Sequence, residues 1–258
     1  MIFKEELQKF AKIIGFNLWQ TEKDYLQHVF LFFLSKESKD EFVFKGGSAL
    51  QKVHGLNRFS IDLDFTLKKD EEKKAIEKVC RNMRDFGLET EIKRIEEFKE
   101  LGRTFVLKIK GPLYDGTEKT LTILRIEISH TKDLFLEPEV KEIIPIYPDI
   151  PPYFILVMKL EEILAEKVRA IFWRSKSRDV YDLWFILRKN ADINFDLINR
   201  KLEYYKMSFS LENFEKKIEE CRENWENELK QTVSFVPRFE NVKKEIIENF
   251  ERRFHGKI

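Results

Sequence analysis

The sequence predicts an α/β fold with a mixed sheet in its first half and helices in its second half. Residues 61–67 alternate apolar and polar side chains with a period of two, as a strand does. Other first-half segments alternate similarly, whereas apolar residues beyond residue 158 recur at helical spacing. Four prolines within 144–153 cannot lie inside a regular helix, so we expect domains of 1–150 and 151–258.

The individual elements follow from apolar spacing and from the residues that interrupt it. Gly46 and Gly47 separate a short strand from a helix, while Asp70 and Gly87 are suited to begin and end a later one. In the first half we expect helices over 3–14, 21–34, 48–53 and 71–86, and strands over 41–44, 61–67, 88–95, 105–109 and 120–128. In the second half we expect helices over 159–174, 177–189, 196–205, 211–232 and 238–254.

Composition narrows the class of protein. The 258 residues include 47 Lys and Arg against 46 Asp and Glu, a net charge of +1, which argues against a general nucleic-acid coat but allows a local basic groove. Apolar runs are far shorter than the roughly 20 residues of a membrane span, so we expect a soluble cytoplasmic protein without a membrane partner. Cys80 and Cys221 are too far apart to suggest a zinc site or disulfide scaffold. Abundant Lys and Glu is typical of a thermophile.

Two aspartates of the strand expected over 61–67 form the first candidate site. Asp62 and Asp64 are two residues apart, so on a strand both carboxylates project from one face. Two adjacent carboxylates repel each other unless a hard divalent ion, Mg²⁺ or Mn²⁺, shares them with phosphate oxygens. The pair predicts a metal site; the alternative is a strand that simply exposes Asp to solvent.

The segment before this strand is suited to bind phosphate. Gly46 and Gly47 let the backbone turn tightly and expose its N–H groups, and Ser48 begins a helix whose amino end favours anions. A Gly-Gly pair alone is more often just a turn. Followed by a strand with Asp62 and Asp64, however, it indicates a triphosphate site.

A third carboxylate is expected to complete such a site. Glu127 lies in a β-like segment, opposite in phase to its apolar neighbours, and is the best candidate. Asp133 is a weaker rival. The alternative for Glu127 is an ordinary solvent-facing position on a strand.

The second half adds a lysine and an aspartate. Lys167 falls within an apolar stripe, so its ammonium must extend to the surface or find an anion such as triphosphate. Asp179 lies in the first turn of the next expected helix, where a structural role is favoured. Asp182 lies beyond that turn and is better placed to line a site.

Taken together, these motifs resemble the AbiEii/AbiGii nucleotidyltransferase toxin family over most of the chain. The resemblance is carried by Glu22-Lys23-Asp24-Tyr25, Phe44-Lys45-Gly46-Gly47-Ser48-Ala49-Leu50, Arg58-Phe59-Ser60, Asp62 with Asp64-Phe65, Glu161-Glu162, Ala165-Glu166-Lys167 and Arg178-Asp179 with Tyr181-Asp182-Leu183. It implies a polymerase-β-like nucleotidyltransferase core with a mixed sheet, followed by a helical domain that completes the active-site cleft.

The expected activity is metal-dependent transfer of a nucleoside monophosphate from an NTP to an acceptor, with pyrophosphate leaving. We expect Asp62, Asp64 and Glu127 to hold the metal, and these three with Lys167 and Asp182 to be catalytic. The nucleotide-binding residues would be Lys45, Gly46, Gly47, Ser48, Arg58, Ser60 and Lys167.

The resemblance further implies a toxin of a toxin–antitoxin or phage-defence system, with a cognate antitoxin and with tRNA or another RNA as acceptor. Arg169, Arg174, Lys176 and Arg178 cluster in sequence near Lys167 and are the expected phosphate contacts. Two alternatives stay open. One is transfer to a small molecule or protein, and the other is a non-catalytic nucleotidyltransferase-like binding module.

Overall fold

The computed structural model describes residues 1–38, 41–67, 72–98, 101–130 and 133–255. The chain divides into two compact units. Unit 1 comprises Met1–Gly55, Phe59–Lys132 and Pro138–Val157, and unit 2 comprises Leu56–Arg58, Asp133–Glu137 and Met158–Ile258. Separate domains of 1–150 and 151–258 stay a prediction.

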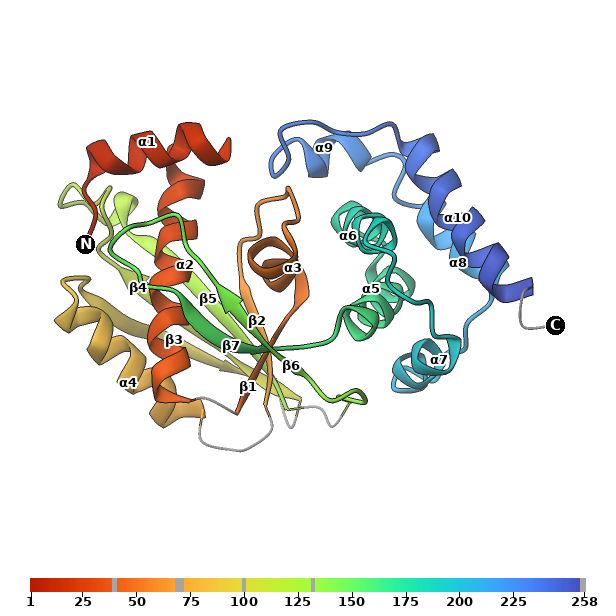
Figure 1. Ribbon diagram of the computed structural model, residues 1–258, viewed down its shortest axis with the longest axis horizontal. Helices are drawn as coiled ribbons and strands as arrows, with labels where there is room; N and C mark the ends of the chain where they lie inside the picture. Colours follow the sequence, from red (N-terminus) through yellow and green to blue (C-terminus); the bar gives the residue numbers. More distant parts are fainter. Residues whose placement is uncertain (39–40, 68–71, 99–100, 131–132, 256–258) are drawn as a thin grey trace. The chain divides into compact units, whose positions relative to one another are not determined.

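Unit 1 is built on a mixed sheet (Figure 1), in which the described residues form seven strands in the order β3-β4-β5-β2-β1-β7-β6. Two pairs, β2 with β5 and β1 with β7, are parallel, and the other pairs are antiparallel. The strands are β1 Phe42–Lys45, β2 Leu63–Leu67, β3 Thr90–Glu97, β4 Gly102–Ile109, β5 Thr122–Ser129, β6 Glu139–Ile143 and β7 Tyr153–Val157. The mixed α/β class expected from the sequence is confirmed.

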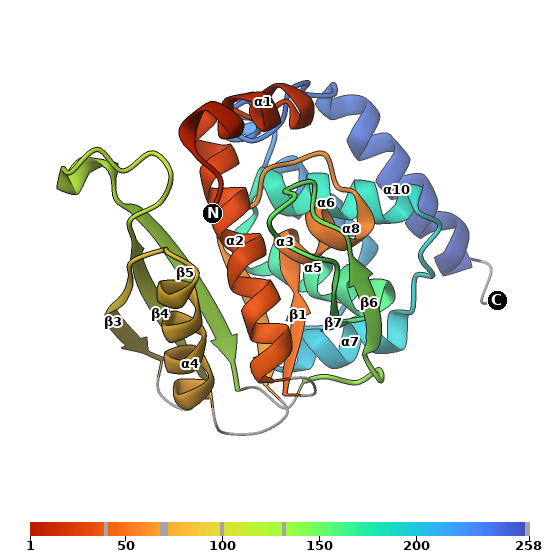
Figure 2. The same cartoon turned by 60° about the vertical axis from the view of Figure 1, so that its left-hand side comes forward.

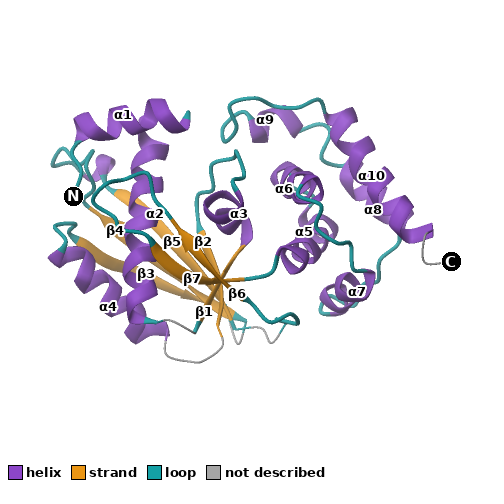
Figure 3. Cartoon of the chain, in the orientation of Figure 1, coloured by secondary structure: helices purple, strands orange, loops and turns teal. Residues whose placement is uncertain are grey.

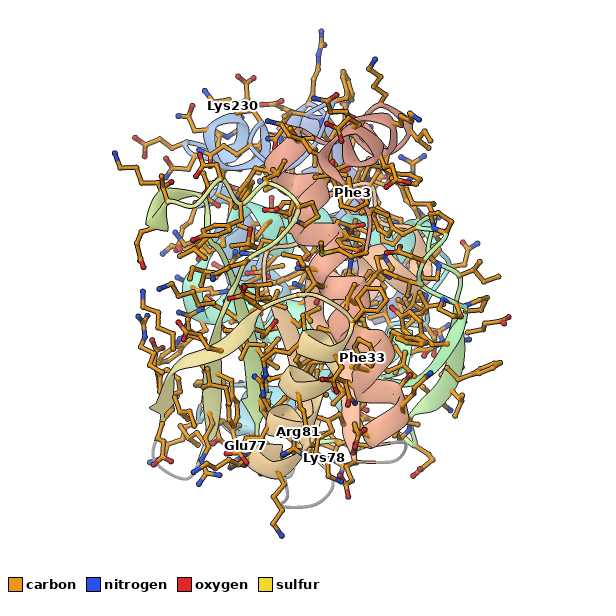
Figure 4. All side chains as sticks on the ribbon, turned by 90° about the vertical axis from the view of Figure 1, so that its left-hand side faces the viewer. Phe3, Phe33, Glu77, Lys78, Arg81 and Lys230 are labelled. Atoms are coloured by element: carbon orange, nitrogen blue, oxygen red, sulfur yellow. The ribbon has the colours of Figure 1, made fainter. Side chains whose placement is uncertain are left out.

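The helices of unit 1 are α1 Lys4–Ile14, α2 Leu18–Glu37, α3 Gly46–His54 and α4 Glu72–Asp85, with a short 3₁₀ helix at Glu118–Thr120. Helices α2 and α4 lie side by side (Figure 2), with Phe33 packed edge-on against Phe86. The outer face of α4 carries the exposed, charged residues Glu77, Lys78 and Arg81 (Figure 4). Because one face of α4 is polar and the other apolar, the helix covers the core and leaves most of its charged residues in solvent, with Glu72 as a buried exception.

Unit 2 is helical (Figure 3), with α5 Leu160–Arg174, α6 Ser177–Arg188, α7 Phe195–Glu203, α8 Leu211–Glu219, α9 Trp225–Leu229 and α10 Phe239–His255. Its core is rich in aromatic rings. The ring of Phe214 packs 5.9 Å from Phe172 and 4.7 Å from Phe250, which joins α5, α8 and α10. Burial of such large rings supplies much of the apolar stabilisation of this unit.

One expectation about secondary structure is wrong, and two strands, β6 and β7, are absent from the sequence expectations. The single helix expected over 211–232 is two helices, because α8 ends at Glu219 and α9 begins at Trp225. The indole N–H of Trp225 donates to the carbonyl of Pro237 at 2.8 Å, a contact that depends on this break. The strand β7 was missed because a short, almost continuously buried apolar run lacks the alternation that identifies a strand. The predicted cap Asp70 lies outside the described residues.

Within the ranges that the structure describes, none of the helices has the length and apolar character needed to cross a membrane.

Candidate active site

Asp64 and Glu127 are direct neighbours on adjacent strands of unit 1. Strands β2 and β5 are parallel, and their register places Asp64 opposite Glu127. On the other side of Asp64, the antiparallel strand β1 places Lys45 opposite it, while β4 places Thr104 opposite Glu127. Because residues in register share one face of a sheet, the four side chains form a lateral row, which we call the Asp64 row.

The first turn of α3 lies against this row. Gly46 has a left-handed backbone, with φ of 71°, and a Cβ at this position would collide with the Asp64 carboxylate. Glycine is therefore required here for both conformation and space. The approach places Asp64 at the amino end of α3, where the helix dipole favours a negative charge.

Asp62 is positioned differently from the sequence expectation. Strand β2 begins at Leu63, and Asp62 lies in the bend before it, so the two aspartates do not share one regular strand. Gln27 of α2 holds this bend by donating to the carbonyl oxygens of Ser60 and Ile61, both at 3.0 Å. Asp62 Oδ1 is buried and accepts no hydrogen bond from any described residue.

The two predicted serines are both buried. Ser48 lies in the first turns of α3, and its hydroxyl makes no hydrogen bond with another described residue. Ser60 donates its backbone N–H to Gln51 Oε1 at 2.7 Å. Gln51 and Gln27 thus fix the backbone on both sides of Ser60, which places the segment before Asp62.

A pocket of about 280 Å³ opens beside the Asp64 row. All four members of the row, Lys45, Asp64, Glu127 and Thr104, line it together with polar and apolar residues of the same part of the sheet. The further lining residues are Phe65, Phe98, Leu101, Gly102, Arg103, Ile128 and Ser129. Carboxylates, cations and apolar groups in one pocket suit a ligand with both charged and apolar parts.

Sequence reasoning missed Arg103, Thr104 and Ser129. The strand was expected to begin at Phe105, but β4 begins at Gly102, where a Cβ would collide with the carbonyl oxygen of Ile128. The alternation of buried and half-exposed residues of β5 does continue to Ser129. These three residues could have been identified from the sequence if the first expected strand had been continued back to Gly102 and the second forward to Ser129.

The carboxylates of Asp62 and Asp64 suit a hard cation, although the described residues do not form a complete set of protein ligands. Across the described ranges, no three His, Cys, Asp or Glu side chains lie close enough together to hold a metal ion. Mg²⁺, however, is commonly held by one or two carboxylates together with water and substrate phosphates. The buried, unpartnered Oδ1 of Asp62 and the carboxylate of Asp64 fit such a site.

Lys167, Asp182 and Arg58 come together in unit 2. The Lys167 ammonium lies 2.7 Å from Asp182 and 3.0 Å from Asp179, and Arg58 binds Asp182 through two hydrogen bonds of 2.8 Å. Arg174 in turn donates to Asp179 at 2.7 and 2.9 Å. We call these five residues the buried ion cluster; Arg174, at its edge, is 43% exposed.

In the buried ion cluster, burial and the neighbouring charges shift the pKa values of the ionisable groups in opposite directions. Burial alone would lower the pKa of Lys167, but Asp182 and Asp179 raise it above the usual lysine range. Burial alone would raise the pKa of both aspartates, but the nearby cations lower it, Lys167 acting on Asp179 and Arg58 with Lys167 on Asp182. All of these groups are therefore charged at neutral pH.

The remaining predicted residues of unit 2 are mostly paired. Arg169 is bound by Asp133, which rivalled Glu127 as third carboxylate, and lies 3.4 Å from Glu166. Lys176 is half exposed and lies 3.4 Å from Glu228, and Arg178 is exposed. Arg169 therefore lacks the accessible charge expected of a phosphate contact.

The fold is that of nucleotidyltransferase toxins. It is similar to MenT4, a nucleotidyltransferase toxin of Mycobacterium tuberculosis, with a TM-score of 0.68 and 20% identity over 97% of this chain and 89% of that one. It is also similar to JHP933 of Helicobacter pylori, with a TM-score of 0.60 and 21% identity over 92% of this chain and 95% of that one. Comparison with curated proteins found no significant match.

The family follows from the sequence itself. Residues 31–252 match the model of the nucleotidyl transferase AbiEii toxin family, of type IV toxin–antitoxin systems. The chain belongs to this family and is a nucleotidyltransferase, as the resemblance implied. Membership also implies an NTP substrate and a cognate antitoxin.

Proposed function

We propose that this protein transfers a nucleoside monophosphate from an NTP to a hydroxyl of an RNA acceptor in a Mg²⁺-dependent reaction. The main observation that supports this reaction is the pairing of Asp64 with Glu127 on parallel strands, beside the amino end of α3. Two carboxylates and a helix amino terminus at one place suit a cation and a polyphosphate together.

Asp62, Asp64 and Glu127 would hold the ion, which when bound neutralises phosphate charge and stabilises the attacking and leaving oxygens. The acceptor oxygen bonds to the α-phosphorus while the bond from that phosphorus to the bridging oxygen breaks, and pyrophosphate leaves. Glu127, half exposed at the side of the pocket, is our candidate to accept the hydroxyl proton. Lys45 lines the same pocket and supplies a cation for the phosphates.

The other nucleotide contacts divide into two groups. The backbone of Gly46, Gly47 and Ser48 would bind phosphate at the start of α3, with Ser60 placing the bend that carries Asp62. Lys167, Arg58 and Asp182 stay proposed site residues, and their ion pairs also hold α5, α6 and residues 56–58 together.

RNA as acceptor is supported by an aromatic and basic surface of unit 2. Trp173 is 62% exposed and its ring lies 4.7 Å from that of Tyr205, next to the exposed ring of Tyr204. Lys176 and Arg178 lie a few residues beyond Trp173 and are accessible. Exposed rings that stack bases, close to cations that bind phosphates, are typical of single-stranded nucleic-acid sites.

The central experiment incubates the purified protein with each α-labelled NTP, Mg²⁺ and total RNA. We expect label in RNA with at least one NTP, and no label with EDTA or with Asp64→Asn. Label in a small molecule or in protein would replace RNA as the acceptor. NTP binding without transfer to any of them would indicate a binding module and contradict the proposed reaction.

The RNA contact has its own test. We expect Lys176→Ala with Arg178→Ala to weaken tRNA binding and to reduce the salt slope by about one unit for each lost contact. Arg174 is left intact because it holds Asp179. The matched control, Lys73→Ala with Lys78→Ala on the outer face of α4, should leave both quantities unchanged. Equal effects of the two double variants would contradict a local RNA site.

A further inference from the structure

Lys23 lies beside the bend that carries Asp62. It is one helical turn before Gln27 on α2, so the two side chains project from the same face of the helix. Gln27 contacts the carbonyl oxygens of Ser60 and Ile61, directly before Asp62. Lys23 therefore lies on the face of α2 that contacts this bend, close enough to Asp62 for the two charges to interact.

Lys23 is almost fully buried as a residue, and among the described residues no carboxylate lies within ion-pair distance of its ammonium. The residue is 5% exposed and forms no hydrogen bond or ion pair with another described residue, and its Nζ lies 5.6 Å from the ring centre of Trp19. Lys52 of the same unit is the informative comparison, because its side chain is only 1% exposed but donates to Asp24 at 2.7 Å. Removing a lysine from solvent without an ion pair lowers the stability of the fold. A functional reason is therefore needed for the position of Lys23, whereas the ion pair with Asp24 explains that of Lys52.

Asp62 is the complementary group. Its Oδ1 is buried and accepts no hydrogen bond from a described residue, yet it does not come within ion-pair distance of Lys23. Burial lowers the pKa of Lys23, the charge of Asp62 opposes this, and Arg125 adds to the lowering. The two charges thus attract each other without direct contact, which leaves the Lys23 ammonium available to an anion that a cation holds at Asp62.

We propose that Lys23 binds a phosphate oxygen of the NTP at the carboxylate site, as a further substrate-binding residue. This inference rests on the proposed function. An ammonium is a compact charge with three donors that binds phosphate well. A phosphate that coordinates a cation at Asp62 would at the same time place an oxygen next to Lys23. The same geometry explains why Lys23 has no carboxylate of its own.

The test uses Lys23→Met with Lys52→Met as the matched buried control, and inorganic triphosphate with Mg²⁺ as the probe. Triphosphate should raise the melting temperature of wild type but raise that of Lys23→Met much less. Without ligand, Lys23→Met should be as stable as wild type or more stable, because an uncompensated buried charge is removed. Lys52→Met should be less stable than wild type but keep the triphosphate-induced shift relative to its own baseline.

Kinetics provide the second readout. Lys23→Met should raise the KM for NTP by about tenfold or more, with a smaller change in kcat, and Lys23→Arg should restore part of the affinity. Lys23→Gln serves if the Met variant does not fold. The proposal is overturned if Lys23→Met and Lys23→Gln keep the wild-type KM and triphosphate shift, or if only the affinity for RNA falls. An absence of transfer by wild type would instead contradict the proposed reaction, while the triphosphate shifts would still report on Lys23.

Discussion

Gly46 lies so close to Asp64 that any side chain at position 46 would collide with the Asp64 carboxylate. This contact joins the first turn of α3 to the centre of the sheet, and it makes the Gly-Gly motif and the Asp motif two parts of one site. Gly46 is therefore needed for the close approach of α3 to Asp64 and not only for the turn of the backbone.

Gly46→Ala should reduce the rate of nucleotide transfer by more than its effect on the free energy of unfolding can explain. Gly55 is the matched control, because its φ of 77° is equally left-handed but nothing lies within 4 Å of an added Cβ. The backbone cost of alanine, about 1–2 kcal/mol, should be shared by both variants in urea unfolding. Transfer should fall sharply only in Gly46→Ala. Equal activity of the two variants would show that the Asp64 contact is not needed.

Asp64→Asn should lower the transfer rate by about 100-fold or more while leaving the melting temperature near that of wild type. The substitution keeps the shape of the side chain but removes the charge. Glu91→Gln on the exposed outer strand β3 is the control and should retain activity. Wild-type transfer by Asp64→Asn at saturating Mg²⁺ would rule out the carboxylate site.

Lys167→Met should destabilise the protein. Lys167 is the buried partner of both Asp179 and Asp182, so its loss leaves those carboxylates short of positive charge at a cost of about 3–5 kcal/mol. The exposed residue Lys216 is the control, and its replacement by Met should have little effect on urea unfolding. An unchanged urea midpoint for Lys167→Met would show that Arg58 and Arg174 alone are sufficient to compensate the charges of the two aspartates.

Acid should weaken the protein through the same cluster. The folded pKa values of Asp179 and Asp182 lie below the ordinary value of 3.8, because the cations of the cluster outweigh burial. The unfolded chain then binds more protons in this range, so the stability they contribute is complete well above pH 4 and is lost as pH falls through the folded pKa values. Urea midpoints measured from pH 6 to pH 3 should fall less steeply for Asp179→Asn than for wild type.

Local patterns determined a large part of this protein. Alternation identified four of the strands approximately, the glycine pair after a short segment identified β1, and helical spacing placed α1, α5 and α6 nearly to their ends. The motif at positions 45–48 and the Asp pair indicated the chemistry, because residue type and short spacing are sufficient to suggest a phosphate and metal site. The family assignment rested on the same motifs and is confirmed.

Only the tertiary structure decided which of these residues meet. The register of β2 with β5 brings Glu127 beside Asp64, although the two lie far apart in the sequence, and no local pattern encodes that pairing. The partners of Lys167 likewise depend on how α5 packs against α6. The sequence motif that contains Lys23 assigned it no role, and only the tertiary structure shows its burial and its place beside the bend that carries Asp62. Sequence spacing specifies local conformation, whereas pairing across the sheet and the burial of charge depend on contacts between distant segments.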